Sequence, residues 1–210
     1  MDLETMRARV RRDLHDEDAA SERWTDDEID RHIARAVQEV SLAAPLESVA
    51  TLTTSAGSRE VSIASLASRV AVEAVEYPGG EQPPRLVPFS TWGDTLTLIV
   101  DAAPAAGESV VVRYSQLHTL DGDGTTLPAA LHDLVASGAA AFAALEWASY
   151  AANRVNVGGT ETWRNYHVWA QERLAAFAKA LAKRGRERRL RSHALYRPEQ
   201  VATGARAVEG

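Results

Sequence analysis

The apolar residues of this 210-residue chain change their spacing twice, and this change constrains the fold more than any other feature of the sequence. From residue 3 to 45 they recur every three or four positions, which is the period of an amphipathic helix. From about 46 to 117 they alternate with polar residues, as in strands, and after Pro128 the helical period returns. This order predicts an α+β fold: a mainly helical body of four helices, an inserted small all-β domain and an extended C-terminal arm.

The same changes set the expected domain boundaries. Residues 1–45 are the N-terminal helical part of the body, 46–120 the inserted β domain, 121–184 the C-terminal helical part and 185–210 the extended basic arm. A first helix is predicted to end near Asp13. Thr25 and Glu28 have the separation of a capping box, so a second helix begins there and stops by Pro45.

The alternating segment predicts about six short strands, enough for a small sandwich or barrel. The first, through residues 49–53, is expected to form a hairpin with a strand through Val61 and Ile63, across a turn at 55–58. Further strands are predicted at 70–77, 85–89, 95–100 and 109–115, each bounded by proline or glycine signals.

Pro128 is placed to open the first turn of a long third helix, which is predicted to reach roughly Val155. Gly158 and Gly159 are expected to break it. A fourth helix follows, with an apolar stripe from Trp163 to Leu181 in steps of three and four. From Gly185 onward no periodicity would bury a face, so this segment is predicted to be extended until it meets a partner.

Composition excludes several classes of protein. Hydrophobic residues make up 45% and charged residues 25%, which is typical of a globular chain, and the absence of cysteine excludes disulfides and thiolate metal sites. No signal peptide is expected, and the alanine-rich stretch 134–152, which contains Glu146, is too polar to prefer lipid. We therefore expect synthesis in a cytoplasm, no membrane partner and no cofactor.

Charge is unevenly distributed along the chain. Residues 183–197 carry +6, so the others carry −12, because the whole chain is −6. A body this acidic repels DNA, and only the basic segment suits a polyanion or an acidic partner. The segment is either a solvated, flexible end or an arm that orders on a partner. Its candidate partner-binding residues, proposed to contact a portal protein, are Arg186, Arg188, Arg189, Arg191, Leu195, Tyr196 and Arg197.

No catalytic or metal-binding motif was found in the sequence. The six histidines are scattered and are expected at the surface or at interfaces. The Asp-Gly-Asp-Gly run at 121–124 departs from a calcium loop, because the sixth position is Thr126 and the twelfth is His132. Glu146 is a candidate buried acid, but a subunit contact or a solvent-facing position is favoured. We therefore predict no catalytic residues and no metal site.

Several stretches resemble the head-tail adaptor, or connector, proteins of tailed phages. The resemblance covers most of residues 1–184. It rests on the opening helix, on the run Trp-Thr-Asp-Asp-Glu-Ile-Asp at 24–30, on Leu-Pro-Ala-Ala-Leu at 127–131, and on the long helical pair through Trp147 and Trp163. The tail past Tyr196 matches nothing in that pattern.

The resemblance implies a structural, non-enzymatic role in the virion neck, with assembly in the bacterial host cytoplasm. It implies a homo-oligomeric ring of about twelve subunits, a dodecamer, between the portal protein and the tail or stopper protein. DNA would pass through an axial channel without sequence-specific binding. Two alternatives stay open: a nucleic-acid-associated regulator that binds through its basic C-terminal segment, and a tail-completion or stopper protein.

Overall fold

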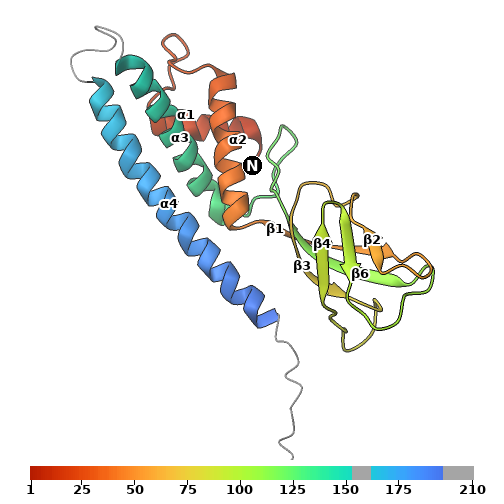
Figure 1. Cartoon of the computed structure of the whole chain (residues 1–210). Coiled ribbons are helices and arrows are strands. Elements are labelled where there is room, and N and C mark those ends of the chain that lie inside the picture. The colour runs from red at the N-terminus through yellow and green to blue at the C-terminus, as the bar shows by residue number, and fades with distance from the viewer. Residues whose placement is uncertain (153–161, 196–210) are drawn as a thin grey trace, which may run out of the picture.

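The computed structural model describes residues 1–152 and 162–195, and these form four helices and six strands, so the predicted α+β class is confirmed. The elements are α1 (Leu3–Leu14), α2 (Asp26–Ala43), β1 (Leu46–Thr53), β2 (Glu60–Ser62), β3 (Arg69–Glu76), β4 (Phe89–Trp92), β5 (Thr95–Leu98), β6 (Ser109–Gln116), α3 (Ala129–Ala152) and α4 (Thr162–Leu195). Figure 1 shows the helices as one body, with the strands gathered at one end.

Side-chain caps fix the starts of the two N-terminal helices. Asp2 accepts a hydrogen bond from the amide of Thr5. At the start of α2, the Thr25 hydroxyl accepts from the Glu28 amide and the Glu28 carboxylate accepts from the Thr25 amide, so the predicted capping box is confirmed. α2 ends at Ala43, as expected for a helix that cannot continue through Pro45.

α3 is the central helix of the body and packs against α1, α2 and α4 (Figure 1). Its alanines from Ala136 to Ala151 are buried, and their small side chains let the neighbouring helices approach closely. Gly138 lies where α3 approaches α4 closely, because a Cβ built there would lie 2.7 Å from the ring of Phe177. That ring meets Phe142 edge-on, at a centroid distance of 5.9 Å. None of the described helices is long and apolar enough to cross a membrane.

The strands form two three-stranded antiparallel sheets, with the orders β1-β6-β3 and β2-β5-β4. Their inner faces enclose a hydrophobic core that is separate from the core of the helices and includes Ile63, Leu96 and Val112. The predicted hairpin between residues 49–53 and 61–63 is wrong, because β1 pairs with β6 and β2 pairs with β5. Alternation marks a strand without marking its partner. The eight residues of β1 pair along the full length of β6, whereas β2 has only three residues with which β1 could pair.

The strand predicted at 85–89 is only partly formed. Leu86 makes an isolated bridge with Glu76, and the regular strand β4 begins at Phe89. Pro88 falls in this stretch, and Pro83 and Pro84 come directly before it. None of the three has an amide hydrogen to donate, so a continuous ladder cannot form there.

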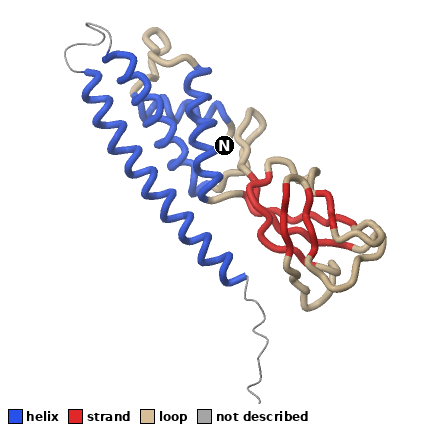
Figure 2. Tube along the Cα trace, in the orientation of Figure 1, coloured by secondary structure: helices blue, strands red, loops and turns tan. Residues whose placement is uncertain are grey.

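The two ends of the β region lie side by side, because Leu46 in β1 pairs with Gln116 in β6. The chain therefore leaves the helical body after α2 and returns to it before α3 at one place, as Figure 2 shows. This is the geometry of an insertion between two parts of one helical body.

α4 continues well past the apolar stripe that predicted it, to Leu195. The extended arm predicted from Gly185 therefore differs from the structure at residues 185–195, which are helical. Arginine and leucine make up six of the eleven residues of this stretch and favour a helix, and the single glycine costs only about 1 kcal/mol relative to alanine. The predicted break at Gly158 and Gly159, and the tail after Leu195, lie outside the described residues.

Candidate interaction sites

The basic end of α4 contacts the β region. Arg188 donates hydrogen bonds to the carboxylate of Glu73 in β3 and to the Ser115 hydroxyl in β6, and its side chain is 27% exposed. This predicted portal-contact residue is thus engaged within the chain. Arg186, two residues earlier, is exposed to solvent.

The other predicted contact residues are less informative. The backbone of Arg189, Arg191 and Leu195 belongs to α4, but their side chains lie outside the description, as do Tyr196 and Arg197 entirely. Arg184 pairs with Glu187 one turn along the same helix, at 3.4 Å. The acceptors for Arg188 were missed by sequence reasoning, because Glu73 and Ser115 lie in strands far from it along the chain.

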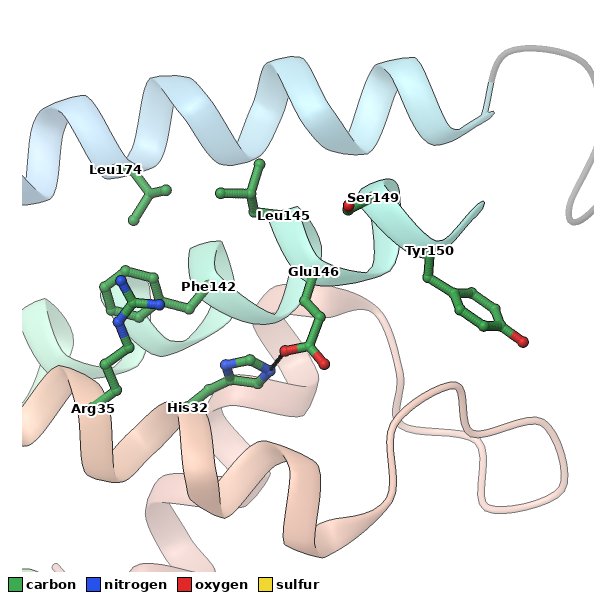
Figure 3. A pocket seen from close by; sticks show the side chains of 8 residues that line it. All are labelled: His32, Arg35, Phe142, Leu145, Glu146, Ser149, Tyr150 and Leu174. Atoms are coloured by element: carbon green, nitrogen blue, oxygen red, sulfur yellow. Dashed lines mark ion pairs between the residues drawn. The ribbon is translucent and has the colours of Figure 1, made fainter. Parts of the chain in front are cut away.

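A half-open cavity of about 510 Å³ lies between α2 and α3, with one wall from α4 (Figure 3). We call it the α2–α3 groove. It is lined by His32, Arg35, Phe142, Leu145, Glu146, Ser149, Tyr150 and Leu174.

Charged side chains from α2 and α3 meet in the α2–α3 groove. Both oxygens of Glu146 accept from one guanidinium nitrogen of Arg31, at 2.6 Å each. The Glu146 side chain is 50% exposed, so it lies at the groove mouth and is not a buried acid. This agrees with the preferred sequence interpretation of a solvent-facing or contact residue. The hydrogen bond to Glu146 raises the pKa of Arg31, so the guanidinium stays charged.

His32 forms the floor of the α2–α3 groove and is buried, with 5% of the residue exposed. Its Nε2 atom lies 3.2 Å from a Glu146 oxygen (Figure 3), yet the described residues give it no partner with hydrogen-bond geometry. Burial lowers the pKa of His32, while the Glu146 charge acts in the opposite direction. The neutral form is therefore the stable one in the folded chain.

Replacing His32 with glutamine should make stability less dependent on pH. Because burial depresses the folded-state pKa below 6.5, the unfolded chain binds this proton more readily, and the stability contribution present above that value is lost as pH falls. Urea unfolding at about pH 7.5 and about pH 5 should show a smaller loss for His32→Gln than for the natural chain. Exposed His15→Asn is the control and should keep the natural loss; equal losses in all three chains would refute the assignment.

His118 connects the β region to the helical body. Its amide donates to the Ser41 hydroxyl at 3.0 Å, and its ring nitrogens lie 3.2 Å from the Thr126 hydroxyl and 3.0 Å from the Ala44 carbonyl. The expected surface position is wrong for His32 and His118, which are both buried within the chain. For His118 these hydrogen bonds offset the cost of burying the imidazole.

The acidic run at 121–124 is a turn. The Asp121 carboxylate accepts from the amides of Asp123 and Gly124, at 2.9 and 3.0 Å, and so closes its own loop. Within the described ranges, no group of three or more histidine or acidic side chains is arranged to hold a metal ion.

Comparison with known protein families gives a match that includes all of the elements described above. The sequence matches the SU10 adaptor protein family over residues 1–201. The chain belongs to this family. The match spans the helical body, the inserted β region and the basic end of the SU10 adaptor chain, so the predicted resemblance to phage adaptor proteins is confirmed.

Two solved structures are similar to this SU10 adaptor family member at low identity. One is the neck of an empty GTA particle computed with C6 symmetry, which is 12% identical with a TM-score of 0.29, covering 80% of this chain and 87% of that chain. The other is the neck of a native GTA particle computed with C12 symmetry, which is 14% identical with a TM-score of 0.28, covering 78% and 89%. No curated protein sequence matches the chain.

Proposed function

We propose that the chain is a non-catalytic head-tail adaptor of a tailed phage particle, forming a ring that joins the portal to the tail or stopper. The observation that carries the proposal is the family match, which runs through nearly the whole chain. The ring is a homo-oligomer, expected to be a dodecamer with about twelve subunits, and it leaves an axial channel for DNA.

Charge supports a channel through which DNA slides. Outside residues 183–197 the chain carries −12, and like charge weakens contact with phosphates. The runner-up function, nucleic-acid binding through residues 183–197, is weakened by ion pairs within the chain. Lys183 and Arg184 lie 4.0 and 3.4 Å from the Glu187 carboxylate, and Arg188 pairs with Glu73.

Exposed apolar side chains support assembly with other subunits. Trp92 is 89% exposed at the end of β4, and Val49 and Val168 are more than half exposed. Large apolar side chains on a surface contribute most when a partner covers them. Two acidic residues singled out in the sequence make contacts within the chain: Asp121 holds a turn, and Glu146 pairs with Arg31.

Deleting residues 196–210 should weaken binding to the purified portal at least about tenfold, which corresponds to about 1.4 kcal/mol. The deletion leaves Arg188 and its contact with Glu73 in place, so the unfolding midpoint should not change. Binding is measured by biolayer interferometry on immobilised portal rings, with exposed Lys179→Ala as the control that keeps natural affinity. Full binding by the truncated chain would exclude these residues as the docking arm.

A further inference from the structure

In the α2–α3 groove, Arg35 has no acidic partner among the described residues, and the Nε2 atom of His32 makes no hydrogen bond there although Glu146 lies 3.2 Å away. Arg35 stacks on Phe142, with its guanidinium carbon 4.0 Å from the ring centroid (Figure 3), and within the described part of the chain no carboxylate pairs with it. The buried Nε2 of His32 likewise makes no hydrogen bond there. The groove therefore holds donor capacity that the subunit does not use.

The carboxylates of Glu146 and Glu28 are bound by residues other than Arg35. Glu146, the one carboxylate among the residues that line the groove, is bound on both oxygens by Arg31. Glu28 caps the start of α2 through Thr25. An arginine stacked on an aromatic ring is held in a fixed plane and presents its fork of donors, which matches the two oxygens of a carboxylate.

The walls of the α2–α3 groove suit a protein partner. Leu145 and Leu174 are partly buried, and Tyr150 is 51% exposed at the rim. Arginine and tyrosine around a small apolar centre are enriched at protein–protein contacts. Charge complementarity identifies the partner, because a second copy of this chain presents an acidic surface, with −12 outside residues 183–197.

We propose that the α2–α3 groove receives a carboxylate side chain from a second copy of the chain, bound by Arg35 next to His32. This inference rests on the proposed ring, since it assigns one of the two unlike faces that neighbouring subunits bring together. A contact between unlike faces generates a closed ring when the rotation between subunits closes.

The test uses the scarcity of lysine in the chain, whose lysines are Lys179 and Lys183. Arg35→Lys places an amine in the α2–α3 groove that a carbodiimide can join directly to a carboxylate in contact with it. Copies labelled with ¹⁴N and ¹⁵N are mixed, assembled and cross-linked, and mass spectrometry then separates links within a chain from links between chains. We expect mixed-label links at the introduced lysine, and the linked peptide identifies the docked acid.

Arg12→Lys is the matched control. Arg12 is exposed on α1 and pairs with Glu17 of its own chain at 3.4 Å, so its lysine should give same-label links. In addition, Arg35→Glu should raise the concentration needed for half-assembly at least about tenfold, because it places a carboxylate where the acid of the second copy would dock.

Failure of this inference can be separated from failure of the ring. If rings form but the lysine introduced by Arg35→Lys gives only same-label links, the α2–α3 groove is not a subunit contact, and the ring stands. If the chain stays monomeric at every concentration and on the portal, the ring and the groove contact are both refuted.

Discussion

Replacing Arg11 with methionine should lower the free energy of unfolding by about 3–5 kcal/mol, the cost expected when one partner of a buried ion pair is removed. The Arg11 guanidinium donates to Asp16 and Asp26 at 2.8 Å each and to the Trp24 carbonyl at 3.0 Å. The Asp16 side chain is 4% exposed. Methionine fills a similar volume but leaves that carboxylate buried without its cation.

Urea unfolding followed by circular dichroism measures the Arg11→Met effect, and the next residue provides the control. Arg12 lies on the same helix with its side chain 75% exposed, so Arg12→Met should change stability by less than about 0.5 kcal/mol. Adding Asp16→Asn to Arg11→Met should recover part of the loss, because the uncompensated charge is removed. A loss below about 1 kcal/mol for Arg11→Met would show that the network does not hold the link between α1 and α2.

Replacing Gly138 with leucine should destabilise the helical body by about 1–3 kcal/mol, the range for overpacking a filled core. A Cβ at this position meets three ring atoms of Phe177 within 3.0 Å, and the Phe177 ring is itself packed edge-on against Phe142. The ring cannot yield without disturbing the contact between α3 and α4.

A second glycine separates overpacking from helix propensity. Gly185 lies on α4 with nothing within 4 Å of a Cβ built there, so Gly185→Ala should stabilise the helix by up to about 1 kcal/mol. Gly138→Leu combined with Phe177→Ala should lose less than the sum of the two single losses, because the new side chain occupies the space that the ring leaves. A Gly138→Leu chain as stable as the natural one would contradict the close approach of α3 and α4.

Local signals in the sequence predicted the helical starts well. The capping box at Thr25 and Glu28 involves residues three apart, and the end of α2 before Pro45 follows from proline itself. Strand positions also followed from alternation, but strand partners did not, because β1 pairs with β6 across more than fifty intervening residues. The residues after Gly185 were predicted to be extended because they carry no apolar stripe. They form a helix without one, so this criterion missed the end of α4.

The candidate sites depend on contacts between distant parts of the chain. His32 and Glu146 approach to 3.2 Å although 114 positions separate them, and Arg188 reaches Glu73 across a similar separation. No spacing rule joins such residues. The spacing of Arg31 and Arg35, one helical turn apart on an exposed face of α2, was the one local signal that could have pointed to the α2–α3 groove.

The central claim is that copies of this chain assemble into a ring that docks on a portal. Mass photometry of the purified chain, alone and after mixing with portal rings, measures this directly. The account predicts a discrete species of about twelve chains, free or added to the mass of the portal. A single monomeric species at all concentrations, with the portal mass unchanged by the mixture, would contradict it.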